Sequence, residues 1–510
     1  MRATGSGRWW ALIALALSIG AVGLDGTILN TALPTISTAL HASTSRLQWF
    51  IDSYNLVMAA TLLPAGLLGD RLGRKKMILI ALGVFGAGSL WCAYAGSAGS
   101  LIAARAVLGA GAAFLVPLCM SVLLVLFEPH ERQRAVSVMT GANMIGFPLG
   151  PILGGVLLKH FWWGSVFLIN VPVVLLGIIV IAAVVPESRN PRRARLDLTG
   201  VVISAVGMVA VTYGVIEAGE RGWSDIRPVA TLAGGALVLA AFVLWERLVG
   251  RRREPLVDLS LFRSSDFTWG TILATMVSFA MFGLLFNTPQ YFQAVLDADS
   301  LGTGLRLLPM VAGLVVGVQV ANRLAARRGP KMPVSIGFAL ITAGLLTGAA
   351  TTLGTGYGFT AGWIAVFGIG LGMTMSTTTM AALGALTKER GGVGSALIMA
   401  LRQLGSAIGV ALLGALANAG YRSHLQLRGL PAAQAAAAHQ GVSAGVAVAA
   451  HDHSLLRSVR SAFIHGMDTT LWVCGGIGAL GLVLALLFLT ARQESTGRQG
   501  RPAPKVPSTP

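Results

Sequence analysis

A carboxylate lies inside the first long apolar stretch of the chain. Asp25 belongs to an apolar run over residues 9–33, which is long enough to cross a lipid bilayer. An ionised carboxylate at the centre of a membrane helix costs roughly 2.5–3.5 kcal/mol, so such a group usually faces a partner or a polar cavity and has a function. We therefore expect Asp25 to bind a proton or a cation.

A positive charge stands at a similar depth in the fourth apolar run. Asp25 lies about nine residues below Pro34, and Arg105 about six residues below the start of its run, so helical rise places them roughly 13 and 9 Å from the outer surface. A guanidinium favours the carboxylate anion, whereas burial favours the neutral acid. This balance predicts reversible proton binding at Asp25; the alternative is a permanent ion pair that only holds helices together.

Three further charged residues lie in or beside apolar runs. Asp52 stands about five residues into the second run, where it is either a second protonatable site or, as this depth favours, an interfacial carboxylate facing water. Glu217 closes the seventh run and is expected at the interface. Arg402, in the thirteenth run, would extend towards water, pair structurally or take part in transport.

The composition is that of a membrane protein. Of the 510 residues, 54% are hydrophobic and 11% charged, whereas soluble domains carry about 25% charged residues. Fourteen apolar runs of about 20 residues predict an all-α polytopic protein. The net charge of +18 is concentrated in loops on one side, which predicts cytoplasmic termini and argues against nucleic-acid binding. The three cysteines lie within the runs, so no extracellular disulfide framework is expected.

Two similar loops indicate a duplicated organisation. Residues 69–75 and 325–331 each follow the second helix of a set and place a glycine among basic residues. We predict a six-helix bundle over 1–186, a linker with two inserted transmembrane helices over 187–266, and a second six-helix bundle over 267–490. The second bundle contains a long outer loop over 420–466, and a disordered cytoplasmic tail over 491–510 follows it.

Five segments between residues 9 and 490 carry a family resemblance. Residues 66–76 resemble the signature loop of the major facilitator superfamily, and residues 24–34 resemble the first-helix motif of its fourteen-helix drug:proton antiporter branch. Residues 105–113 and 146–155 are similar to the basic fourth-helix motif and the fifth-helix antiporter motif, and residues 161–172 most resemble the quaternary-ammonium and cationic-dye efflux subgroup. The resemblance implies two six-helix bundles plus two inserted helices.

The same motifs imply roles for particular residues. The signature loop implies a conformational gate at Gly66, Asp70, Arg71, Gly73 and Arg74, in which Asp70 clamps the two halves with the help of a helix N-terminus. Ala326 replaces this acid in the second half, so the gate is expected to be asymmetric. The antiporter motif implies close packing, a proline-softened helix and a barrier to leak, carried by Gly146, Pro148, Gly150, Pro151, Gly154 and Gly155.

Aromatic and methionine side chains are candidates for lining a substrate cavity, because ring faces attract cations by about 0.5–2 kcal/mol. Together with Asp25, the candidates are Tyr54, Met144, Phe147, Phe282, Phe286 and Tyr291. The loop over 420–466 carries five histidines without a recognised ligand spacing and is expected to be a solvated loop or surface helix. No metal and no organic cofactor is implied.

These observations predict a proton-coupled antiporter that exports amphiphilic, mostly monovalent cationic drugs, dyes and biocides across the cell membrane as a monomer. Its partners would be protons, those cations and the lipid bilayer. Residues 305–319 and 395–416 lack Asp and Glu, which argues for exchange of one proton per monovalent cation. The alternatives are export of one dedicated product, such as an antibiotic or a lipid precursor, and, more remotely, a membrane enzyme or a sensor. The loops offer no convincing catalytic cluster, and a sensor would not require Asp25 and the gate together.

Overall fold

The structure is a computed structural model that describes residues 7–188, 197–249, 259–384, 391–427 and 430–489. All regular secondary structure in these ranges is helical, which confirms the all-α fold class. The first half comprises α1 (Gly7–Ala39), α2 (Thr44–Leu72), α3 (Arg74–Ala93), α4 (Ala98–Leu126), α5 (Pro129–His160), α6 (Ser165–Leu168) and α7 (Asn170–Val184).

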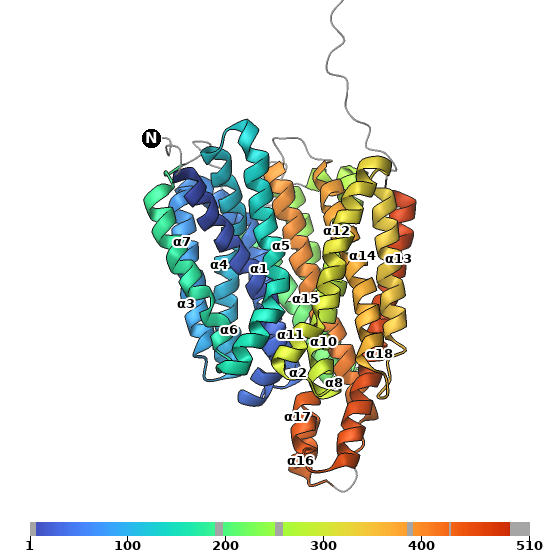
Figure 1. Cartoon of the computed structure of the whole chain (residues 1–510). Coiled ribbons are helices and arrows are strands. Elements are labelled where there is room, and N and C mark those ends of the chain that lie inside the picture. The colour runs from blue at the N-terminus through green and yellow to red at the C-terminus, as the bar shows by residue number, and fades with distance from the viewer. Residues whose placement is uncertain (1–6, 189–196, 250–258, 385–390, 428–429, 490–510) are drawn as a thin grey trace, which may run out of the picture.

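Most of the remaining helices are also long and run nearly parallel to the long axis of the bundle (Figure 1). The inserted pair is α8 (Leu198–Arg221) and α9 (Ile226–Val249). The second half comprises η1 (Leu259–Arg263), α10 (Ser265–Ala294), α11 (Ser300–Arg306), α12 (Leu308–Arg328), α13 (Lys331–Gly348), α14 (Tyr357–Gly384), α15 (Gly391–His424), α16 (Ala432–Ala438), α17 (Val442–Val448) and α18 (His453–Phe488).

Helix length and apolarity agree with a multi-pass membrane protein. Twelve elements in the described residues are long and apolar enough to cross a bilayer, with α6–α7 and α11–α12 each acting as one span. The helices α2 and α5, of 29 and 32 residues, run through the bundle beside them, and with these two the number equals the fourteen spans expected.

The two halves repeat one packing pattern. In the first half α1 packs on α5 and α7, α4 packs on α2 and α3, and α3 packs on α7. In the second half α10 packs on α15 and α18, α14 packs on α12 and α13, and α13 packs on α18. The repeated loops adopt the same kind of turn, because Gly73 and Gly329 have positive φ values of 111° and 77°. Such φ values strain residues with a Cβ, which explains a glycine at both positions.

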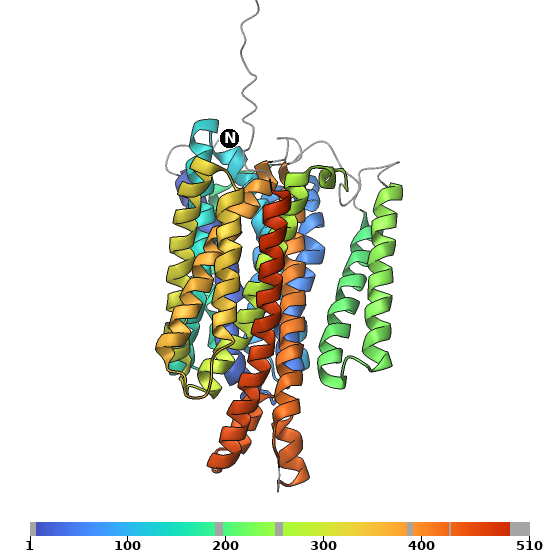
Figure 2. The same cartoon turned by 90° about the vertical axis from the view of Figure 1, so that its right-hand side faces the viewer.

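The inserted helices stand outside the two bundles. Figure 2 shows α8 and α9 as a separate pair beside the rest of the molecule. The main contact of this pair with the bundles is made by α8, which packs against α2 of the first half and α15 of the second. From α9, Phe242 packs against a cluster that includes Phe267 of α10. Apolar side chains on α9 are widely exposed, among them Leu237 and Leu244, as expected of a lipid-facing helix.

The start of α1 and the end of α18 lie at one end of the bundle, here called the terminal end (Figure 1). The opposite end, here called the cap end, carries α16 and α17. The segment over 420–466, for which a solvated loop or surface helix was expected, is largely helical. Within it, α15 extends to His424, α16 and α17 follow, and α18 begins at His453. Between them, Tyr421 donates a hydrogen bond to the carbonyl of Ala438 at 3.0 Å, and Val442 is buried.

Candidate functional site

Asp25 on α1 and Arg105 on α4 form a buried ion pair. The distance between Arg105 Nη1 and Asp25 Oδ2 is 2.7 Å, and the two side chains are 2% and 0% exposed. The predicted proximity of these two groups is confirmed. Removing either partner would leave the other charge buried without a counter-charge. The ion pair therefore stabilises the packing of α1 against α4.

Three more helices position this ion pair. Arg105 Nε donates to the carbonyl of Phe50 on α2 at 2.9 Å, and its guanidinium carbon lies 4.3 Å from the ring centroid of Tyr54. Asn170, the first residue of α7, donates from Nδ2 to Asp25 Oδ1 at 3.2 Å and to Ser89 Oγ on α3 at 3.3 Å. Both oxygens of the Asp25 carboxylate are therefore bonded.

Asn170 and Ser89 belong to the hydrogen-bond network of this ion pair, and the sequence reasoning missed both. Both are polar residues within long apolar runs, and both are buried. Polar groups in such runs seldom face lipid, so this position was the signal that could have identified them. Spacing along the chain gave no hint of their contact, because 81 residues separate them.

The glycines of the fifth helix lie directly against α1. A Cβ on Gly146 would lie 2.5 Å from the carbonyl oxygen of Gly20, and one on Gly150 would overlap Thr27 Oγ1. Gly154 lies against Ile28 in the same way. The predicted close packing is confirmed, and α5 continues as a helix through Pro148 and Pro151. Thr27 is two residues from Asp25, so this packing fixes the carboxylate as well.

The two halves meet closely towards the cap end. The backbone of α5 at Pro151 touches Gly304 on α11, and a Cβ on Gly155 would lie 2.7 Å from the carbonyl oxygen of Ser300. Gln293 on α10 donates to the carbonyl of Thr31 on α1 at 3.2 Å. The turn between α16 and α17 adds to the contact between the halves. The backbone N–H of Thr44, at the start of α2, donates to the carbonyl of Gln440 in this turn at 2.9 Å.

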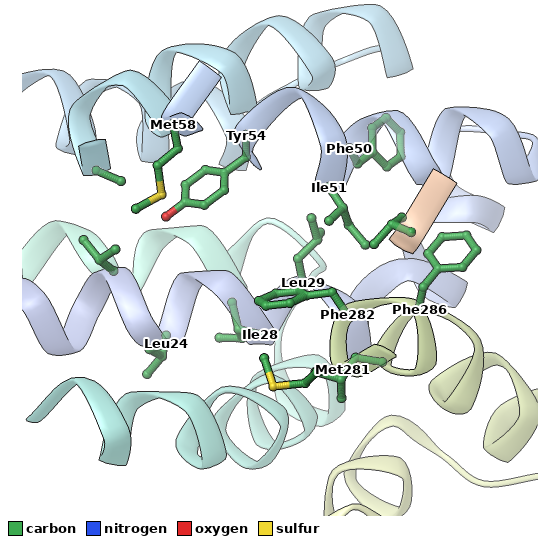
Figure 3. Close-up of a cluster of buried hydrophobic side chains, with 14 of the residues drawn as sticks. Leu24, Ile28, Leu29, Phe50, Ile51, Tyr54, Met58, Met281, Phe282 and Phe286 are labelled. Carbon is green, nitrogen blue, oxygen red and sulfur yellow. The ribbon is translucent and has the colours of Figure 1, made fainter. Parts of the chain in front are cut away.

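Apolar and aromatic side chains fill the space between the halves. Figure 3 shows Phe282, Phe286 and Met281 of α10 facing residues of α1 and α2, with Tyr54 nearby. All are buried members of one core cluster. The structure therefore brings together three of the aromatic candidates, and Tyr54 connects them to Arg105.

The other substrate candidates do not join this cluster. The hydroxyl of Tyr291 lies 3.4 Å from Thr360 Oγ1 on α14, and its ring lies beside Phe292, within the second half. The side chains of Met144 and Phe147 lie outside the described residues, as does that of Pro148 in the antiporter motif.

Asp52 does not face water. It is 0% exposed, and neither carboxylate oxygen has a hydrogen-bond partner among the described residues. The interfacial interpretation is therefore wrong. Depth along the helix suggested the bilayer surface, but α8 and α15 cover this side of α2.

The signature loop is held to the end of α7. Glu187 accepts hydrogen bonds from the backbone N–H groups of Lys75 and Lys76, both at 3.2 Å, at the start of α3. A helix N-terminus attracts an anion, and the sequence reasoning had assigned that role to Asp70. Glu187 occupies this N-terminus, while the side chain of Asp70 lies outside the described residues, as does Gly66.

The remaining gate and charged residues have ordinary local partners. Arg71 is exposed, and Arg74 Nη1 lies 3.4 Å from the carbonyl of Ser121. Arg402 Nε donates to Ser278 Oγ on α10 at 3.1 Å. Glu217 pairs with Arg221 at 2.8 Å. Within the described ranges, no three His, Cys, Asp or Glu residues gather as a metal site would require.

Comparisons with known proteins agree on one family. The profile of the Major Facilitator Superfamily matches residues 15–410. The chain is 31% identical over 511 residues to the tetracenomycin C resistance and export protein of Streptomyces glaucescens, covering 97% of this chain and 94% of that protein. It is 34% identical over 481 residues to the multidrug efflux pump LfrA of Mycolicibacterium smegmatis, covering 91% and 92%.

A solved structure shares the fold. The crystal structure of a bacterial homologue of the human lysosomal transporter Spinster, in an inward-facing and unoccupied conformation, superimposes with a TM-score of 0.67 at 17% identity. The match covers 96% of this chain and all of that one.

Proposed function

We propose that this chain, which belongs to the major facilitator superfamily, exports amphiphilic cationic drugs from the cell in exchange for protons. As a member of this superfamily it is a multi-pass membrane transporter and not a membrane enzyme. The single observation that carries the coupling proposal is the fully buried Asp25–Arg105 pair with Asn170 on the second carboxylate oxygen.

Protonation of Asp25 supplies the coupling step. A proton bound at Oδ1 or Oδ2 neutralises the carboxylate, so the attraction that joins α1 to α4 is lost and the Arg105 guanidinium is left without its anion. Arg105 still bonds to the backbone of α2 through Phe50 and faces Tyr54. Protonation therefore changes the relative stability of two arrangements of α1, α2 and α4, which is the requirement for a proton to drive a conformational change.

The conformation supports alternating access. The halves are in contact towards the cap end, at Pro151–Gly304 and Gln293–Thr31. The basic loops favour a cytoplasmic terminal end by the positive-inside rule, and with that orientation this conformation is closed to the outside. Export then requires these contacts to separate and the terminal end to close.

The aromatic cluster supports an amphiphilic cation as the substrate. Tyr54, Phe282 and Phe286 lie between the halves (Figure 3), and the ring of Tyr54 faces the Arg105 guanidinium that pairs with Asp25. Ring faces and a carboxylate attract a flat, delocalised cation, and separation of the helices would open the apolar surfaces to it. The site lies within one chain, which supports action as a monomer.

Asp25 alone would exchange one proton for one monovalent cation. Such a cycle moves no net charge, so it would respond to the pH gradient and not to the membrane potential. Export of one dedicated product is the second candidate, and the similarity to a tetracenomycin C export protein favours it as much as the similarity to LfrA favours multidrug efflux. Both candidates use the same ion pair.

Ethidium efflux from cells tests this proposal. We expect the wild type to export ethidium, a protonophore to stop export, and Asp25→Asn to lose export at normal expression. Asp225→Asn, a carboxylate in the α8–α9 turn, is the matched control and should export normally. Export by Asp25→Asn equal to the wild type would refute coupling through Asp25. No export by the wild type would favour a dedicated substrate.

A further inference from the structure

A second buried polar site lies where α2, α8 and α15 meet. Leu56 and Ala59 of α2 pack with Met208 of α8 and Ala407 of α15, while Trp49 of α2 packs against Ile216 of α8. These contacts enclose the stretch of α2 between Trp49 and Leu56. Asp52 lies in this stretch, three residues after Trp49 and four residues before Leu56. Residues with these spacings lie on the same face of a helix, so Asp52 faces the same way as Trp49 and Leu56.

The facing stretch of α8 contributes a hydroxyl. Thr212 lies between Met208 and Ile216, four residues from each, and therefore on the face that packs on α2 and α15. It is 0% exposed, and its Oγ1 has no hydrogen-bond partner in the part of the chain that the structure describes. Asp52 and Thr212 thus occupy corresponding positions on two packed helices.

Hydrogen-bond donors and acceptors without partners lie close together along α2. Both oxygens of Asp52 lack partners among the described residues, and so does Nδ2 of the buried Asn55, which is three residues along α2. Asn55 Oδ1 accepts from Gln403 Nε2 of α15 at 3.4 Å, and Gln48 Nε2 donates to the carbonyl of Ala411 at 2.9 Å. Polar groups therefore join α2 to α15 on both sides of Asp52, while Asp52 itself is left unbonded.

Charged and titratable groups of the surrounding helices are engaged elsewhere. Asp25 and Arg105 pair with each other next to Phe50 and Tyr54, on another face of α2. Their counterparts on α15 and α8 are bonded away from Asp52. They are Arg402 with Ser278 of α10 and Glu217 with Arg221 towards the cap end. The ring of Tyr213 on α8 is tilted against that of Trp49, with a centroid distance of 6.3 Å. The basic residues of α3 that lie near α2, namely Arg74, Lys75 and Lys76, are at the terminal end.

We propose that Asp52 is a second proton-binding site, completed by the inserted helix α8, which holds its proton in this conformation and releases it when the helices shift. A fully buried carboxyl without a hydrogen-bond partner or counter-charge is carried in its neutral form. Movement of α2 against α8 and α15 brings the Thr212 hydroxyl within bonding distance. It also separates Asn55 from Gln403 of α15, which frees the Asn55 side chain to turn its Nδ2 towards Asp52 on the same helix. A donated hydrogen bond favours the anion. The proton leaves to water and the carboxylate stays.

This site changes the charge balance of transport, and it rests on the proposed exchange at Asp25. With Asp25 and Asp52 both carrying protons, two protons enter for one monovalent cation that leaves. One net positive charge then moves inwards in each cycle, so an inside-negative potential drives export without a pH gradient. It also gives the inserted helices a function, since α8 supplies one wall of the site.

Purified protein in sealed vesicles provides the test, with ethidium as the cation and protein-free vesicles as the leak control. At about 100 mV and no pH gradient, we expect the wild type to maintain an ethidium gradient about 50-fold above that of Asp52→Asn. Asp52→Asn should retain exchange driven by a pH gradient. Thr212→Val should weaken the response to potential, and Thr212→Ser, which keeps the hydroxyl, should restore it.

The other outcomes separate the two proposals. An Asp52→Asn variant that keeps the full response to potential would overturn the second site. The second site would also be overturned if Asp52→Asn unfolded at the wild-type temperature but lost both the exchange driven by potential and the exchange driven by a pH gradient. Asp52 would then be needed for the exchange of one proton at Asp25 and would not add a second proton. Loss of both forms in Asp25→Asn is expected, whereas their persistence there would overturn the proposed function and leave Asp52 as the coupling group.

Discussion

Two carboxylates of this protein are equally buried but have opposite surroundings. Asp25 contacts Arg105 at 2.7 Å and accepts a second hydrogen bond from Asn170, within the first half of the molecule. Asp52 lies in the junction of the first half, the inserted helix α8 and the second half, and its oxygens have no partner among the described residues. One side chain has a counter-charge and a hydrogen-bond donor, and the other has neither within the described part of the chain.

This difference shows that the partners of a buried carboxyl, and not its burial alone, decide its role. Arg105 is anchored to the backbone of α2 independently of Asp25, so the cation is present whichever form the acid takes. Among the described residues, the unused donors near Asp52 are uncharged, and our proposal requires a rearrangement before they bond to it. We therefore expect Asp25 to respond to the binding of a proton, and we expect the protonation state of Asp52 to change with the arrangement of the two halves.

Removing the cation from the paired site is the change with the largest expected effect. Arg105→Ala leaves the Asp25 carboxylate buried without a counter-charge, and we expect it to lower the free energy of unfolding by about 3–5 kcal/mol. Thermal unfolding in detergent measures this loss. The double variant Asp25→Asn/Arg105→Gln should recover most of the stability while remaining inactive, and a double variant no more stable than Arg105→Ala would contradict the ion-pair explanation.

Moving α1 away from α5 should also have a large effect. Leucine at Gly150 cannot fit against Thr27 and Ile28, so α1 must shift and carry Asp25 with it. We expect Gly150→Leu to destabilise the protein by about 1–3 kcal/mol and to abolish ethidium efflux. Gly234→Leu on α9, where a Cβ meets nothing within 4 Å, is the control. Equal losses in both variants would show that the effect is not specific to the α1–α5 contact.

Removing the amide from the paired site tests the second hydrogen bond of Asp25. Asn170→Leu deletes the donor to Oδ1, and a hydrogen bond to a charged group is worth about 1.5–3 kcal/mol. Ser89→Ala, which removes only the other partner of Asn170, should cost less, about 1 kcal/mol. Chemical denaturation of both variants gives the comparison, and the reverse order of effects would mean that Asn170 serves Ser89 rather than Asp25.

Neutralising the unpaired carboxyl should have the smallest effect on stability. A protonated Asp52 and an asparagine have nearly the same shape and no charge, so Asp52→Asn should change the free energy of unfolding by less than about 0.5 kcal/mol at neutral pH. Asp25→Asn should be clearly more destabilising, because it leaves Arg105 buried without its anion. Unfolding curves of the two variants, recorded side by side, decide this, and a large loss at Asp52 would mean that it is ionised and bonded.

The sequence alone determined the class of the protein and the first of the two sites. Apolar runs of membrane length require helices, because backbone groups in lipid must bond within their own segment. The depths of Asp25 and Arg105 in the membrane follow from the rise per residue of a helix, and the glycine spacing of α5 predicts close helix packing. Each of these inferences depends on distances along one helix, which the order of residues sets directly.

Only the tertiary structure decided the rest. Asn170, Ser89 and Glu187 reach their partners across the bundle, and the sequence holds no measure of which helices are neighbours. Asp52 shows the same limit most clearly. Its depth along α2 suggested water, but its surroundings depend on which helices cover that face, and α8 and α15 come from distant parts of the chain.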